Sequence, residues 1–159
     1  MALPRQRDLF TRRWRMPSHA PDKEVQLQIQ LVTMLRPPVG CLKPTVTFFH
    51  VPNGEVRDKR TAAKLKAMGV LAGVADLVFL WKEIDESEGE TRKYLRVLFL
   101  ELKLPGRQAT DSQIEFALAV RLAGAEYKVA RSIDAALELL RERDLLDPRR
   151  KIYLPGARP

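Results

Sequence analysis

Residues 94–103 read YLRVLFLELK, an apolar run that ends in two charged residues. Its length and its Leu, Val, Phe and Tyr content predict a β-strand. Glu101 and Lys103 lie two positions apart, so both side chains point to the same face of the expected sheet. The run therefore predicts a strand that presents a charged pair where a buried face would otherwise continue.

A second apolar run, residues 77–81, precedes the first, and Asp76 opens it. The acidic segment between them, residues 83–90, contains Ser87 and Gly89, and this turn-like composition predicts an antiparallel hairpin. Pairing of the two strands can bring Asp76 opposite Glu101, where like charges repel. Two carboxylates held together require a cation, and oxygen ligands of this kind suit Mg²⁺ or Mn²⁺, with the carbonyl of Leu102 as a further oxygen.

The remaining segments predict helices and strands around this hairpin. We expect a strand at 45–51, a helix at 57–68, a helix from the capping box at 110–113 to Gly124, a strand at 127–130 and a helix after Ser132. Residues 22–36 are ambiguous, because the alternation of apolar residues with glutamines favours a strand, whereas the N-cap residue Asp22 and the stop at Pro37 favour a helix. The order predicts an α/β fold with a mixed sheet flanked by helices.

Length and composition limit the classes of protein. The 159 residues suit one domain, which we expect at 22–147, between a basic N-terminal arm at 1–21 and a basic tail at 148–159. A single cysteine, Cys41, excludes an intramolecular disulfide and a cysteine-based zinc site. No apolar stretch approaches the roughly 20 residues of a membrane span. These features predict an intracellular, cytoplasmic protein with no membrane partner.

The charge distribution points to a polyanionic partner. Lys and Arg number 28 against 20 Asp and Glu, which gives a net charge of +8. Basic residues gather in the N-terminal arm, near the C-terminus and at 57–66, and nucleic acid is the expected partner because such residues displace counterions from phosphates. The alternative is that the basic segments only increase solubility.

In this context, residues 24–141 resemble the VRR-NUC (virus-type replication-repair nuclease) domain of the PD-(D/E)xK nuclease superfamily. The resemblance is carried, in order, by Glu24 with Gln28, by HVPNG at 50–54, by Lys64 with Gly69, by GVADL at 73–77, by ELK at 101–103 and by Gln113. Ala75 departs from the proline that usually precedes the aspartate, a change that removes no ligand.

The resemblance implies a restriction-endonuclease-like fold, makes residues 22–36 a helix, and implies a metal-dependent structure-specific DNA endonuclease. Its members favour branched DNA such as four-way (Holliday) junctions or flaps, tend to form homodimers, need Mg²⁺ or Mn²⁺ but no small-molecule cofactor, and would act in a host-cell cytoplasm if viral. The implied catalytic residues are Glu24, Asp76, Glu101, Lys103 and Gln113, with the metal on Asp76, Glu101 and Leu102. For nucleic-acid contacts we expect His50, Asn53, Arg57, Lys59, Arg60 and Lys64.

Simpler interpretations of these residues stay open. Gln113 can be only a capping-box residue, Glu24 can only favour a helix N-terminus, and His50 can be a surface histidine. The whole chain can be a non-catalytic DNA-binding or scaffold module, a nuclease for ordinary duplex DNA, or an enzyme that acts on RNA.

Overall fold

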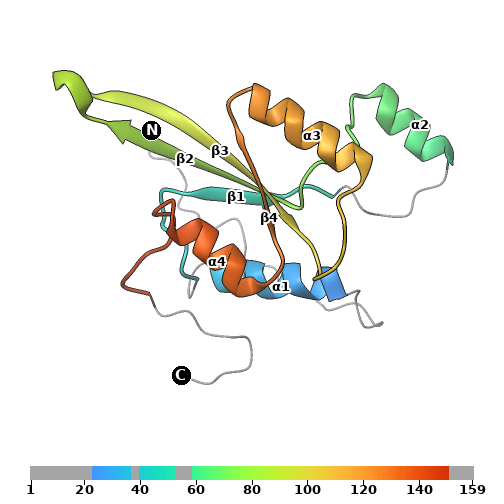
Figure 1. Ribbon diagram of the computed structural model, residues 1–159, viewed down its shortest axis with the longest axis horizontal. Helices are drawn as coiled ribbons and strands as arrows, with labels where there is room; N and C mark the ends of the chain where they lie inside the picture. Colours follow the sequence, from blue (N-terminus) through green and yellow to red (C-terminus); the bar gives the residue numbers. More distant parts are fainter. Residues whose placement is uncertain (1–22, 37–39, 53–58, 151–159) are drawn as a thin grey trace, which may run out of the picture.

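The computed structural model describes residues 23–36, 40–52 and 59–150 (Figure 1). Its elements follow one another in the order expected from the sequence. They are α1 (Lys23–Leu35), β1 (Thr47–His50), α2 (Lys59–Ala67), β2 (Leu77–Asp85), a 3₁₀ turn (Ser87–Gly89), β3 (Arg92–Leu102), α3 (Asp111–Leu122), β4 (Glu126–Ala130) and α4 (Ile133–Arg141).

The strands form one mixed sheet in the order β1-β2-β3-β4. The β1–β2 and β2–β3 pairs are antiparallel, and β4 joins β3 in parallel after the crossover through α3. Helices α1 and α4 cover one face, and α3 covers the other (Figure 1). The predicted mixed α/β sheet flanked by helices is therefore confirmed.

Alternation along β3 divides the interior into two cores. Leu98, Leu100 and Leu102 point to the larger core with α1 and α4, where burial stabilises each such side chain by roughly 1.5–3 kcal/mol. Phe99 points to the opposite face and packs edge-to-face on Phe116 of α3. Glu101 follows Phe99 on that same face, so it lies at the boundary of the smaller core rather than in solvent.

The alternation of apolar residues with glutamines at 22–36 favoured a strand, and this interpretation is wrong. Residues 23–35 form helix α1, as the resemblance implied. Leu27, Leu31 and Met34 recur at helical spacing and, with Leu35, face the larger core. Val25, one of the alternating apolar residues, is exposed instead. The helix prevails because only this period buries a continuous face; Asp22, the expected N-cap, lies outside the described residues.

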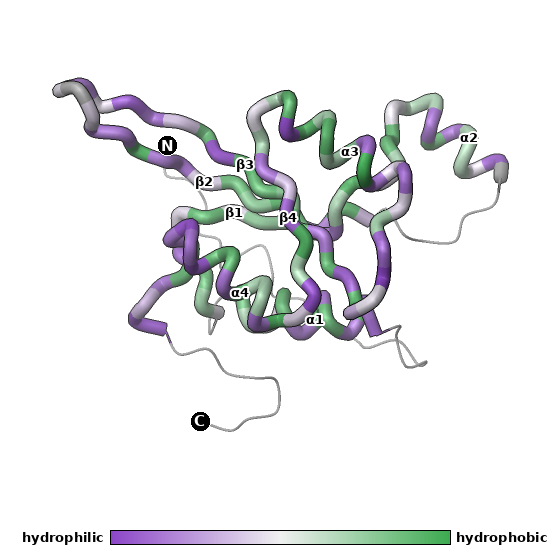
Figure 2. The backbone as a smooth tube through the Cα atoms, viewed as in Figure 1, coloured by the Kyte–Doolittle hydropathy of each residue, from purple (hydrophilic) through white to green (hydrophobic). Residues whose placement is uncertain are grey.

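The hairpin is longer than expected, because β2 continues into the acidic segment as far as Asp85 and β3 already starts at Arg92. Its far half projects from the helices as a two-stranded, largely hydrophilic arm (Figure 2). A cross-strand ion pair at 3.2 Å joins Glu83 to Arg96 in this arm. Glu83 and Asp85 thus belong to β2, whereas Glu86, Glu88 and Glu90 lie in or beside the 3₁₀ turn that reverses the chain.

None of the helices in the described part of the chain is long and apolar enough to cross a membrane. The expected N-terminal arm and residues 151–159 of the expected tail lie outside the described residues, as do Asn53 and Arg57.

Candidate active site

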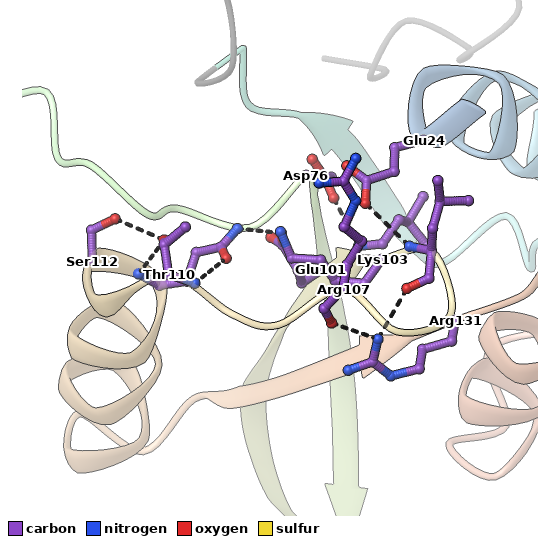
Figure 3. A network of polar contacts seen from close by, with 11 residues as sticks. Glu24, Asp76, Glu101, Lys103, Arg107, Thr110, Ser112 and Arg131 are labelled. Carbon is purple, nitrogen blue, oxygen red and sulfur yellow. Dashed lines mark hydrogen bonds and ion pairs between the residues drawn. The ribbon is translucent and has the colours of Figure 1, made fainter. Parts of the chain in front are cut away.

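The two carboxylates meet where β2 begins and β3 ends. Leu77 pairs with Leu100, and continuation of that register places Asp76 opposite Glu101. The Asp76 side chain turns toward β3, where its Oδ2 accepts a hydrogen bond of 2.7 Å from the backbone N–H of Leu102 (Figure 3). Asp76, which directly precedes β2, thereby satisfies the backbone donor of the last residue of β3.

Glu101 is a buried acid, with 3% of its surface exposed. Its Oε1 lies 3.2 Å from Lys103 Nζ and accepts a short hydrogen bond from the side-chain amide of Gln113. Its Oε2 is buried and has no hydrogen-bond partner in the described part of the chain. Burial, followed by the negative charge of Asp76, raises the pKa of Glu101 to about 7.

The pKa of Asp76 is also raised, chiefly by burial, while the Leu102 N–H opposes the change. Each acid is therefore held in surroundings that disfavour its negative charge. Cations would relieve this cost, and one cation, Lys103, is already half-buried beside Glu101.

Gln113 joins the start of α3 to the acidic pair. Its Oε1 accepts from the Thr110 backbone N–H at 3.0 Å, and Thr110 caps the helix in return, which completes the predicted capping box. Its Nε2 donates to Glu101 at the same time. The capping box is thus confirmed, and Gln113 also contacts Glu101; its catalytic role stays a prediction.

Gly73 brings the chain before Asp76 close to the start of α3. Its φ is +78°, and a Cβ at this position would lie 2.2 Å from the carbonyl oxygen of Ser112 and 2.6 Å from the Gln113 nitrogen. Only glycine permits both this conformation and this approach. Gly73 therefore allows the segment before Asp76 to pack directly against the first turn of α3, which carries Gln113.

Glu24, in the first turn of α1, reaches the turn that follows β3. Its Oε1 accepts from the Leu104 N–H at 3.1 Å. Its charge also contributes to the raised pKa values of Asp76 and Glu101. Arg131 holds the same turn from the other side by donating to the carbonyls of Leu104 and Arg107 at 3.1 and 2.8 Å (Figure 3).

His50 lies at the end of β1, beside the backbone of Asp76. Its Nδ1 is 2.8 Å from the Asp76 carbonyl oxygen and 2.8 Å from the Gln28 side-chain amide. The backbone N–H of Val51 also donates to that carbonyl, at 3.2 Å. His50 thus contacts the main chain of Asp76 directly.

The structure brings together Glu24, Asp76, Glu101, Leu102, Lys103, Gln113 and His50. The other expected nucleic-acid residues form a separate group: Arg60 and Lys64 are exposed on α2, which Figure 1 places beyond α3 at the edge of the molecule. Lys59 starts that helix, and its side chain is outside the described part, like Asn53 and Arg57.

Sequence reasoning missed Tyr127 and Arg131. The Tyr127 hydroxyl is buried without a hydrogen-bond partner in the described part of the chain. Burial, the charges of Glu101 and Asp76, and the proximity of the Glu101 side chain to the hydroxyl raise the pKa of Tyr127. No sequence signal marks either residue, because one lies in an ordinary strand and the other is an arginine in a loop.

The donor atoms fit a hard divalent cation. A cation that binds through oxygen would stabilise the unpaired Glu101 Oε2 and the two carboxylates, whose pKa values are raised. No group of three His, Cys, Asp or Glu residues within the described ranges is arranged to hold a metal ion. Mg²⁺ in proteins is commonly bound by one or two carboxylates and keeps several waters, and Asp76 and Glu101 are the carboxylates that would hold it.

Comparison with known proteins supports the fold. The sequence matches no protein-family model and no curated protein. A solved structure described as a "VRR_NUC domain protein" is similar to this chain with a TM-score of 0.52 and 24% sequence identity, over 81% of this chain and 94% of that chain. The chain therefore has the fold of that protein over most of both lengths.

Proposed function

We propose that this chain is a metal-dependent nuclease of the VRR-NUC type that hydrolyses DNA phosphodiester bonds. The observation that carries the proposal is the buried Glu101 opposite the half-buried Asp76, with Lys103 beside it, at the sheet end of a fold shared with a VRR_NUC domain protein. Like charges that face each other across a strand pair are destabilising, and a bound cation would offset that repulsion.

Asp76 and Glu101 would hold Mg²⁺ or Mn²⁺. Within a strand, the N–H and C=O of one residue point to the same edge, so the Leu102 carbonyl faces the side on which its N–H meets Asp76. This supports Leu102 as a third oxygen ligand. When bound, the ion would polarise a phosphoryl oxygen and lower the pKa of water.

Lys103 would stabilise negative charge that develops on the phosphoryl group, and it would orient the attacking water. Its ammonium is half-buried against Glu101, so its position is defined before the DNA binds. Gln113 fixes the rotamer of Glu101 through Oε1 and leaves Oε2 available. Glu24 secures the turn after β3 and adds negative charge near the pair.

DNA binding would use the basic surface of α2, with Lys59, Arg60 and Lys64, together with His50, Asn53 and Arg57. The net charge of +8 and the exposure of Arg60 and Lys64 support this role. Such contacts position the backbone and carry no base sequence information.

Branched DNA, such as a four-way junction or a flap, is the substrate class we propose, with a homodimer as the acting form. A four-way junction presents two strands for symmetric cutting, and a twofold dimer supplies two equivalent sites. The branched substrate and the homodimer are both properties that the family resemblance implies, and here we propose them for this chain.

The test is cleavage by the purified full chain with Mg²⁺ or Mn²⁺ on matched junction, flap, single-strand, duplex and RNA substrates. Asp76→Ala and Glu101→Ala serve as controls, and light scattering gives the oligomeric mass. Absence of cutting on every substrate, or cutting that survives both substitutions, would refute the nuclease proposal and leave a DNA-binding module. A mass of one protomer at micromolar concentration would refute the dimer.

A further inference from the structure

The contacts of His50 are directed at Asp76 rather than outward. Its Nδ1 atom lies 2.8 Å from the Asp76 carbonyl, which can only accept a hydrogen bond. Nδ1 therefore carries the proton if this contact is attractive. The same carbonyl also accepts from the Val51 N–H, so two donors from the end of β1 hold one backbone oxygen of the acidic pair.

Gln28 contacts the same ring nitrogen. Its side-chain Nε2 is 2.8 Å from Nδ1, on the side of α1. A protonated Nδ1 requires the amide to be turned so that its oxygen faces the ring, an exchange that leaves the shape of the amide unchanged, and the single N–H is then shared between that oxygen and the Asp76 carbonyl. The opposite arrangement, in which Nδ1 accepts from Gln28, would set the Nδ1 lone pair against the Asp76 carbonyl oxygen.

We infer that His50, braced by Gln28, is a positioning residue that acts through Nδ1–H on the backbone of Asp76. Helix α1, strand β1 and the metal-binding aspartate are thereby connected through one imidazole ring. The inference rests on the proposed function for its catalytic consequence, and it changes the role of His50 from a contact with DNA to a support for Asp76.

This arrangement resembles the outer partners of metal ligands, whose loss commonly costs roughly 10–100-fold in metal affinity or activity. The Nε2 atom takes no part in it. Two substitutions separate the two ring nitrogens: His50→Asn places an amide N–H near the position of Nδ1, and His50→Gln places one near the position of Nε2.

The first measurement uses metal-free protein and no substrate. The ¹⁵N chemical shifts of the neutral His50 imidazole, assigned by their loss in His50→Asn, are expected to show the Nδ1–H tautomer. An Nε2–H tautomer would overturn the inference whatever the enzyme does. In Gln28→Ala the preference for the Nδ1–H tautomer should weaken; an unchanged preference would remove Gln28 from the proposal.

The second measurement is steady-state cleavage with Mn²⁺, and Mn²⁺ binding by calorimetry. We expect His50→Gln to lose roughly 10–100-fold in kcat or Mn²⁺ affinity with KM for DNA unchanged, and His50→Asn to recover most of that loss. Equal losses in both variants, or an effect confined to KM, would overturn the inference in favour of a DNA contact. Failure of the wild-type chain to cut would instead refute the proposed function, and the tautomer would still report on the inference.

Discussion

Asp76, which directly precedes β2, accepts a 2.7 Å hydrogen bond from the backbone N–H of Leu102, the last residue of β3. The side chain thus replaces a missing strand neighbour, and it leaves its second oxygen for other use. The structural role and the metal-binding role of the Asp76 carboxylate can therefore be tested separately. The structural role needs one oxygen acceptor, whereas metal binding needs negative charge.

Asp76→Asn should therefore keep the fold and lose the metal. The amide oxygen can still accept from Leu102, but the negative charge is gone, so Mn²⁺ binding and cleavage should fall by more than the roughly 10–100-fold typical of an outer partner. Calorimetry with Mn²⁺ and thermal unfolding provide the two measurements. Asp76→Ala, which removes the acceptor too, should also lower the melting temperature, and tight Mn²⁺ binding by either variant would contradict the metal assignment.

Glu101 predicts a specific dependence of stability on pH. Its folded pKa of about 7 exceeds the ordinary value of 4.5, so between these limits the native state binds a proton that the unfolded state has released. The unfolding free energy of metal-free protein should decrease as pH rises from about 4.5 to about 7, by up to roughly 3 kcal/mol at about 1.4 kcal/mol per pH unit. Urea unfolding across this range measures the decrease.

The control for this dependence is Glu101→Gln, which cannot titrate. Its unfolding free energy should vary less between pH 5 and pH 8 than that of the wild type. Added Mg²⁺ or Mn²⁺ should stabilise the wild type more at pH 8 than at pH 5, because the ion binds the ionised pair. Parallel pH profiles for the two proteins would show that Glu101 is not the group responsible.

The two roles of Gln113 can be tested apart. Gln113→Ala removes both the capping-box acceptor and the donor to Glu101, whereas Thr110→Ala removes the helix cap and leaves that donor in place. Both should cost about 1 kcal/mol of stability. Only Gln113→Ala should also lower kcat by roughly 10–100-fold, since only it frees the Glu101 side chain; comparable kcat values for the two variants would reduce Gln113 to a cap.

The element order and the pairing of the hairpin were predictable because local signals specified them. The capping box at Thr110 and the apolar runs each act within a few residues, and each appears in the structure as expected. Helix α1 shows the opposite case. The alternation of apolar residues with glutamines is compatible with a strand as well as with a helix. The helix is specified only by packing against α4 in the larger core.

The site was predictable only in part, for a related reason. Asp76 and Glu101 could be brought together from strand pairing alone, because a hairpin register is local information. The contribution of Arg131 could not, since it depends on where a loop after the parallel crossover returns relative to the turn after β3. Tyr127 likewise becomes notable only through its burial beside the acids.

Basic residues on α2 should govern the salt dependence of DNA affinity. If Lys64 neutralises a phosphate, Lys64→Ala should weaken binding of every DNA sequence and reduce the slope of log affinity against log salt by about 1. Lys82→Ala is the matched control, because Lys82 is exposed on the projecting hairpin arm, away from α2 (Figure 1). Equal slopes for the wild type and Lys64→Ala would show that Lys64 does not contact a DNA phosphate and is only exposed to solvent.

Gly73 and Gly69 form a natural pair for testing how the site is held. Both have positive φ, of +78° and +91°, so alanine should cost each roughly 1–2 kcal/mol of backbone strain. A Cβ at Gly69 meets nothing within 4 Å, whereas at Gly73 it would collide with the backbone of Ser112. Gly73→Ala should therefore cost roughly 2–5 kcal/mol in total, or displace the start of α3.

The consequence for activity follows from the same collision. A displaced α3 carries Gln113 away from Glu101, so Gly73→Ala protein that remains folded should lose kcat, while Gly69→Ala should cut DNA at close to the wild-type rate. Urea unfolding and single-turnover cleavage on both variants measure the two effects. Similar stability losses in the two variants would mean that the approach of residue 73 to the helix does not constrain the site.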